Sequence, residues 1–159
     1  MAGCSPTLDW RHIRPEGADV DALFPCRPDR HARAVLLAGA RTKMEMLVCS
    51  AGGATFALSF VDLADPALVT AAVAELRAAA LANIGGVELG REPVQVSGMT
   101  ANAQAARLVI SGRLPDGDAV QEQAAFFVRG LRVYQASVIG AKLRADMTDT
   151  FFASLKLPS

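Results

Sequence analysis

Residues 65–86 of the chain read DPALVTAAVAELRAAALANIGG, and this stretch separates two strand-rich halves of the sequence. Asp65 is a favourable N-cap, and Pro66 suits the first helical position, where a missing N–H has no cost. Apolar residues then recur every three or four positions and form one stripe: Val69, Val73, Leu76, Ala80 and Ile84. Gly85-Gly86 ends the pattern, because glycine adopts the left-handed backbone that closes many helices. The stretch predicts a long helix in the middle of the chain.

Segments with strand patterns precede this helix. Residues 41–50 alternate as a strand does, with Thr42, Met44, Met46 and Val48 on one face and Lys43, Glu45, Leu47 and Cys49 on the other. Turn residues at Gly39-Ala40 and at Ala51-Gly52-Gly53 separate this segment from its neighbours. We therefore expect a first meander with strands at 31–38, 41–50 and 54–61, after two shorter candidates at 8–14 and 20–26.

A second group of strands and a closing helix follow. The expected strands are 93–99, 105–114, 119–129 and 131–139. Residues 115–118, Pro-Asp-Gly-Asp, lack the further ligands of a calcium loop, so a hairpin turn is favoured. The last helix should begin near Asp146, with Asp149 facing its positive end and Phe151, Phe152 and Leu155 docked on the sheet. The expected fold class is α+β: a largely antiparallel sheet of two meanders, packed against a long central helix and a C-terminal helix.

The bulk composition excludes several classes of protein. A chain of 159 residues with 52% hydrophobic and 20% charged residues can bury a core, so disorder is excluded. Sixteen Lys and Arg balance sixteen Asp and Glu, which gives no basic footprint for nucleic acid. No apolar run reaches the roughly 18 residues that a membrane span needs.

The first residues resemble the end of a bacterial lipoprotein leader. Met1-Ala2-Gly3-Cys4 is similar to the Leu-Ala-Gly-Cys lipobox, which is cut before its cysteine. The resemblance implies a lipid on Cys4, a tether remnant at residues 1–9 and a single domain at 10–159. Ser5 is similar to the residue found in lipoproteins sorted to the outer membrane. We therefore expect a periplasm-facing protein of the bacterial cell envelope, held at the membrane by its N-terminal lipid; an incidental cysteine is the alternative.

Two further cysteines, Cys26 and Cys49, suggest a disulfide in an exported protein. The bond would close a loop of 24 residues, counted inclusively, and stabilise the fold by about 3 kcal/mol. Two buried free thiols are the alternative. A zinc site is disfavoured because His31 is the only histidine nearby.

No catalytic constellation is present in the sequence. The two histidines, His12 and His31, lie in polar, charged surroundings typical of surface residues, and a Cys–His pair would need a free thiol. Glycine pairs without the spacing of a phosphate loop and the absence of a nucleophile-elbow serine point the same way. We expect no enzyme activity, no cofactor and no metal.

Three phrases resemble the PsbP-like fold: Leu23-Phe24-Pro25, the Asp-Pro start of the mid-chain helix, and the closing DTFFASLKL at residues 149–157. That fold includes the extrinsic P subunit of photosystem II, a Ran-binding nuclear-transport factor and many uncharacterised bacterial lipoproteins. The resemblance covers roughly residues 10–157. It implies the fold but no activity, because this fold hosts unrelated roles, and no metal-binding or Ran-binding residue of these relatives matches a position here.

The remaining patterns each allow two interpretations. Met44 and Met46 fit core packing better than a soft-metal site, and Phe56, Leu58 and Phe60 also read as core. Four arginines near the first hairpin fit a solvated rim, or else a surface for an anionic partner or lipid headgroups: Arg27, Arg30, Arg33 and Arg41.

Two functions fit these observations. The first is a non-catalytic binding or accessory module for another, unknown envelope protein. The alternative is a small-ligand carrier with a pocket between helix and sheet, lined by Met44, Met46, Phe56 and Phe60.

Overall fold

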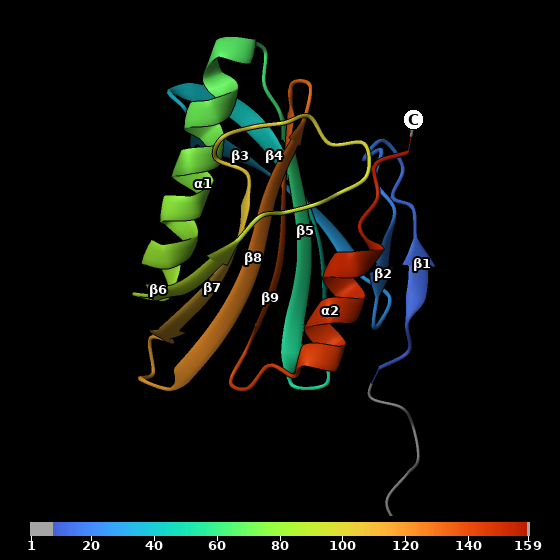
Figure 1. Cartoon of the computed structure of the whole chain (residues 1–159), viewed down its shortest axis with the longest axis vertical. Helices are drawn as coiled ribbons and strands as arrows, with labels where there is room; N and C mark the ends of the chain where they lie inside the picture. The colour runs from blue at the N-terminus through green and yellow to red at the C-terminus, as the bar shows by residue number, and fades with distance from the viewer. Residues whose placement is uncertain (1–7, 159) are drawn as a thin grey trace, which may run out of the picture.

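The computed structural model describes residues 8–158 of the chain, so Cys4 and the other residues 1–7 of the expected tether lie outside it. The fold is α+β, as predicted: a seven-stranded antiparallel sheet, a two-stranded ribbon and two helices (Figure 1). The strands are β1 (Arg11–Ile13), β2 (Ala22–Phe24), β3 (Asp29–Leu37), β4 (Ala40–Ala51), β5 (Ala54–Asp62), β6 (Val87–Glu92), β7 (Ala106–Arg113), β8 (Ala119–Arg129) and β9 (Arg132–Gly140). The helices are the short 3-10 turn η1 (Pro66–Leu68), α1 (Val69–Asn83) and α2 (Ala145–Ser154).

The two predicted meanders join into one sheet, in the strand order β3-β4-β5-β9-β8-β7-β6. The junction is the antiparallel pair of β5 with β9, which runs from Ala54 opposite Gly140 to Asp62 opposite Arg132. β1 and β2 form the separate ribbon. Because β5 and β9 occupy the middle, β3 and β6 become the two edges of the sheet.

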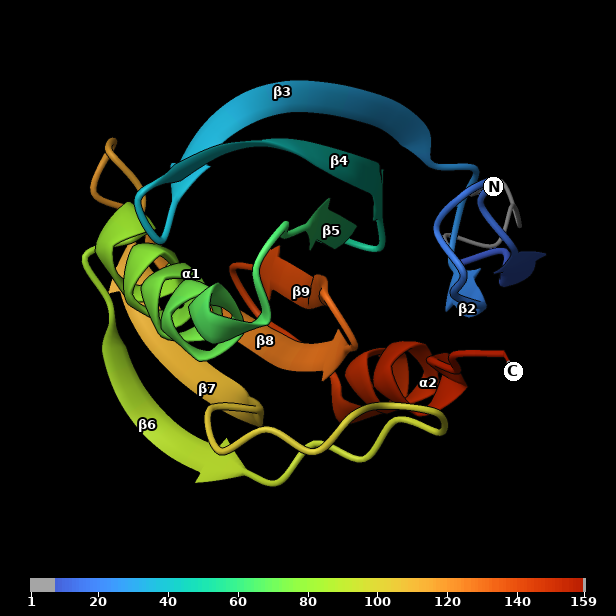
Figure 2. The same ribbon diagram turned by 90° about the horizontal axis from the view of Figure 1, so that it is seen from above.

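The sheet is curved, and α1 lies in its hollow side (Figure 2). The sheet residues that pack with α1, which we call the α1 face, include Met44, Val61, Phe126 and Val133. The helix is shorter than the predicted one. Its first turn is the 3-10 turn η1, where the Asp65 side chain accepts a hydrogen bond from the Ala67 N–H, and η1 and α1 together span 18 residues. A 3-10 turn is common at a helix start.

The opposite side of the sheet, which we call the α2 face, carries an aromatic core. Its sheet residues include Phe56, Leu58, Phe127 and Tyr134. Phe151 of α2 meets the Phe56 ring edge-on, with 5.4 Å between centroids, so the closing helix docks as predicted. The ribbon and the segment after β6 cover the rest of this face (Figure 2).

The predicted strand at 93–99 is wrong. The strand here is β6, and the chain leaves the sheet edge at Pro93, which lacks a backbone N–H for the ladder. The segment that follows crosses the α2 face and is held at single points, such as the bond from Leu157 N to Ser97 O at 2.9 Å. The predicted turn at Gly39-Ala40 is displaced by one residue, because positive φ values fall on Ala38 and Gly39.

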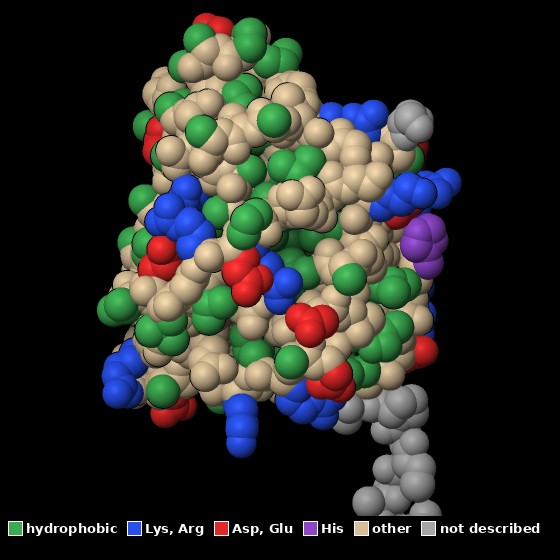
Figure 3. All heavy atoms as spheres, in the orientation of Figure 1, with side chains coloured by type: hydrophobic (Ala, Val, Ile, Leu, Met, Phe, Trp, Pro, Cys, Tyr) green, Lys and Arg blue, Asp and Glu red, His purple; other side chains and the backbone are tan. Residues whose placement is uncertain are grey.

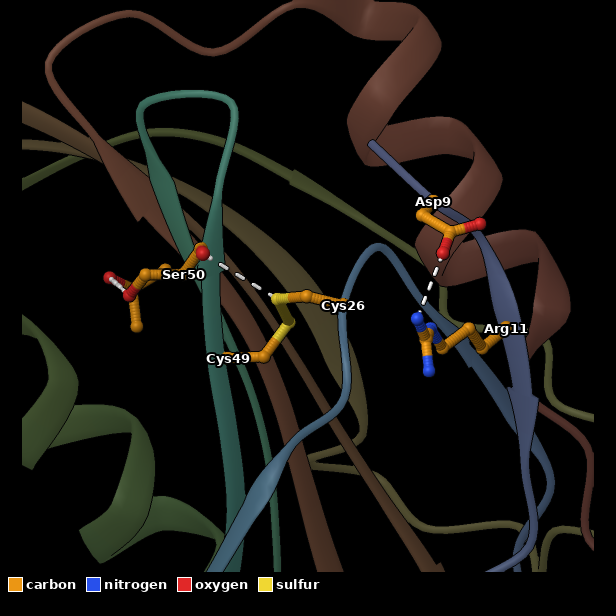
Figure 4. Close-up of a disulfide and its surroundings, with 6 residues drawn as sticks. Asp9, Arg11, Cys26, Cys49 and Ser50 are labelled. Atoms are coloured by element: carbon orange, nitrogen blue, oxygen red, sulfur yellow. Dashed lines mark hydrogen bonds and ion pairs between the residues drawn. A yellow bond between two sulfur atoms is a disulfide. The ribbon is translucent and has the colours of Figure 1, made fainter. Parts of the chain in front are cut away.

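The disulfide between Cys26 and Cys49 is confirmed, with 6.0 Å between the Cα atoms. Cys26 lies on the connection between β2 and β3, and its side chain points to Cys49 on β4 (Figure 4).

Leu8 and Asp9 also contact the body: Leu8 packs against the core of the α2 face, and the Asp9 N–H donates to Pro25 O at 2.8 Å. Both residues belong to the tether remnant expected at residues 1–9. Among the described residues, no helix has the length and apolar character to span a membrane.

Candidate functional site

β3 is the longer of the two strands that form the edges of the seven-stranded sheet. Its nine residues pair with β4 without a register shift, from Asp29 opposite Val48 to Leu37 opposite Ala40. Within residues 8–158, β4 is the only strand that pairs with β3. The side chains of residues 29–34 are exposed on both faces of the sheet. The outer backbone groups of β3 are therefore available to another strand.

The opposite edge is built differently. β6 is six residues long, its register shifts between Glu88 and Gly90, and an ion pair joins Arg91 to Glu88 at 3.1 Å. Short length, irregular pairing and charged side chains are the devices by which proteins block unwanted strand pairing. β3 is nine residues long and pairs without a register shift, so it lacks the first two of these devices, although it does carry charged side chains.

The hairpin of β3 and β4 is positively charged, although the whole chain is neutral. Residues 27–45 contain five cationic side chains against two acidic ones, Asp29 and Glu45: the cations are Arg27, Arg30, Arg33, Arg41 and Lys43. Arg30 is paired with Glu45 at 2.7 Å. In the part of the chain that the structure describes, the other four cations make no ion pair.

These cations lie on both sides of the sheet. Arg33 stands opposite Met44, so it projects from the α1 face, and with Met46 it borders a shallow hollow of about 210 Å³. Lys43 stands opposite Ala34 on the other face. Leu36, on that face too, is 72% exposed. The edge thus offers charge above and below the backbone and an apolar side chain near its end.

The ends of β3 are held in place by local structure. The disulfide joins Cys26, three residues before the strand, to the neighbouring strand β4. At the other end, Ala38 and Gly39 take φ values of 52° and 76°, the left-handed conformations that a two-residue hairpin turn requires. The edge is therefore fixed before any partner arrives.

A second candidate site is a hollow of about 290 Å³ between α2, residues 92–96 and the sheet. Figure 3 shows it as a depression with hydrophobic side chains inside and charged ones at its rim. Arg107 lies over the Phe152 ring, 4.2 Å from its centroid, and its Nε donates to Gln123 Oε1 at 3.2 Å. Its Nη2 is 3.5 Å from Asp149 Oδ1. Asp149 thus pairs with a strand residue, a contact that the sequence did not predict.

The predicted lining of a carrier pocket is wrong. Met44 lies on the α1 face, whereas Phe56 and Phe60 are buried in the core of the α2 face, on the other side of the sheet. Neighbouring strand residues and α2 fill the space around these phenylalanines, which confirms the prediction that they are core residues. The hollow beside Arg107 uses none of the four predicted residues.

Glu122 is a buried acid that the sequence reading missed. It lies on β8 between Ile110 and Ile139 and is 7% exposed. Burial raises the pKa of this carboxyl to about 7, because a low-dielectric surrounding disfavours the charged form. A signal was available: Glu122 interrupts the alternating apolar residues of β8 that face α1, Val120, Ala124, Phe126 and Val128.

The structure places both histidines at the surface, as expected from the sequence. His31 is exposed on β3, and His12 is exposed with its Nε2 3.9 Å from Asp21 Oδ2. Both remaining cysteines are in the disulfide, so the alternative of a Cys–His pair is wrong. Cys4 lies outside the described residues.

No family model and no curated protein matches this chain in sequence.

Proposed function

We propose that this chain is a non-catalytic binding module of the bacterial cell envelope that engages another envelope protein through β3. The observation that carries the proposal is the free edge itself: nine residues in regular register, of which residues 29–34 are exposed on both faces, flanked by cations without an ion pair among the described residues. Strand addition to such an edge is a recurring mode of protein recognition.

Two further features support a place in the envelope. A disulfide persists in oxidising compartments such as the bacterial periplasm, and this one fixes the start of the binding strand. A lipid on Cys4, which the lipobox-like residues before it imply, would tether the domain to the outer membrane, facing the periplasm. The resemblance to the PsbP-like fold, whose members include extrinsic subunits of larger assemblies, fits an accessory role.

The test of this function is crosslinking of the lipidated protein in living cells of its source, followed by identification of what co-purifies. The matched variant reverses two edge charges, Arg33→Glu with Arg41→Glu, which leaves the disulfide and both cores untouched. We expect one stoichiometric envelope protein from the wild type and its loss from the variant. Recovery of the protein alone, or of the same adducts from both forms, would contradict the proposal.

A small-ligand carrier is the second candidate, and the hollow beside Arg107 favours it. The hollow combines an apolar floor, from Val94, Val96 and Phe152, with one guanidinium that would orient a polar group. Native mass spectrometry of protein isolated from cells tests this role. A carrier would show an added mass that disappears when Ala153→Trp fills the hollow; unchanged protein mass in both forms would reject it.

A further inference from the structure

We infer that the partner contributes an extended acidic segment, which adds to β3 as an eighth strand of the sheet. This inference rests on the proposed function and names the chemistry of the partner at the same edge. β3 spans about 30 Å at roughly 3.4 Å per residue, which accommodates a partner segment of similar length.

The backbone supplies the affinity of such a contact and the side chains supply its selectivity. An added strand lies about 4.8 Å from β3, and its side chains alternate between the two faces of the sheet. On the α1 face they would lie beside Arg33. On the α2 face Arg30 is already paired with Glu45. The cations of this face without an ion pair among the described residues, Arg41 and Lys43, lie one strand further in. Cross-strand pairs of opposite charge are favourable. Acidic residues on both faces of the added segment therefore complement this edge.

A second copy of this chain does not fit the edge. Two β3 strands paired about a two-fold axis place the central residue opposite itself, and the centre of Asp29–Leu37 is Arg33. Like charges directly opposite each other are destabilising. In any other register, each copy still brings five cations against two acidic residues in residues 27–45. The edge therefore favours an acidic partner over self-association.

An anionic lipid surface matches the arrangement less well. A flat surface contacts cations that lie on one plane, whereas Arg33 and Lys43 project from opposite faces of the sheet. Lipid binding would also leave the outer backbone groups of β3 without strand partners. A strand satisfies both the backbone and the charges at once.

The experiment is a titration of the disulfide-bonded protein with synthetic nine-residue peptides, followed by amide chemical shifts in NMR. The acidic probe carries glutamates on both faces between valines and threonines. The matched controls are the same peptide with lysines for glutamates and the acidic peptide with alternate backbone N-methyl groups. We expect the acidic peptide alone to shift the β3 amides. We also expect Arg33→Glu with Arg41→Glu to weaken its binding by at least about tenfold, as loss of complementary charge does.

Four results would overturn the inference. The N-methylated peptide could bind as tightly as the acidic one, which would show plain charge attraction without strand addition. The lysine peptide could bind equally well, which would remove the acidic preference. Vesicles of phosphatidylglycerol could bind through the same arginines while the peptide does not, which would assign the edge to lipid. If the peptide fails while crosslinking in cells still depends on Arg33 and Arg41, the binding function stands and the acidic strand is wrong.

Discussion

Glu122 makes the folding stability of this domain depend on pH in a direction opposite to that of most acidic residues. The carboxyl lies between two isoleucines on the α1 face, and its pKa is raised to about 7. The folded state therefore holds a proton that the unfolded state has lost between about pH 4.5 and pH 7. The protonated Glu122 carboxyl therefore leaves the folded state at its full stability below this window, and the stability falls as the pH rises through the window.

The magnitude follows from the two pKa values. A move of the carboxyl pKa from 4.5 to about 7 corresponds to roughly 3 kcal/mol of folding free energy above the window, as an upper bound. Glu122→Gln replaces the carboxyl by a neutral amide of the same size. We expect the variant to match the wild type below about pH 4 and to be more stable by up to about 3 kcal/mol above about pH 8.

Urea unfolding of the disulfide-bonded proteins measures this difference. With a slope of about 2 kcal/mol per molar, the midpoint of the variant should rise by up to roughly 1.5 M at the higher pH. Glu75→Gln, on the exposed side of α1, is the matched control and should shift the midpoint little at either pH. Equal gains for Glu122→Gln at both pH values, or no gain at either, would refute the reasoning.

Three further predictions concern stability. Cys26→Ala with Cys49→Ala should lower the free energy of unfolding by about 3 kcal/mol in urea titrations, and an unchanged value would mean that the bond does not constrain the unfolded chain. Ala38→Asn should raise the free energy of unfolding by roughly 0.5–1 kcal/mol, and with it the thermal midpoint, because asparagine tolerates the positive φ of this turn better than alanine; a lower midpoint would contradict that turn geometry. Gly112→Ala should destabilise the fold by about 2 kcal/mol or more, because its Cβ would meet the backbone oxygen of Ile84; calorimetry showing no loss would contradict that close approach.

The local elements of the fold could be predicted from the sequence. The Asp-Pro start and the apolar stripe gave the helix, and glycine pairs and alternation gave the hairpins, because each of these signals lies within a few residues. The disulfide could also be predicted, since two cysteines remained once Cys4 was assigned to a lipid. The strand at 93–99 failed because an apolar stretch after Pro93 looks the same whether it pairs with a strand or crosses a sheet.

The candidate site could not be predicted in the same way. β3 was expected as a strand, but its place at the edge depends on the pairing of β5 with β9, whose paired residues lie 70 to 86 positions apart along the chain. Non-local pairing leaves no short-range pattern. The same holds for the contact of Arg107 with Asp149, which joins β7 to the last helix. The sequence predicted that the four arginines near the first hairpin are exposed. Only the order of strands in the sheet shows that they lie at or beside a free edge.

The most direct test of the account is photo-crosslinking in cells from single positions on the lipidated protein. A photoreactive residue replaces Ala34 on β3, Leu89 on the opposite edge β6, or Glu75 on α1, all of which are exposed. We expect Ala34 to yield one discrete adduct with an envelope protein and the other two positions to yield none of it. An adduct formed equally from all three positions, or from Leu89 alone, would contradict binding through β3.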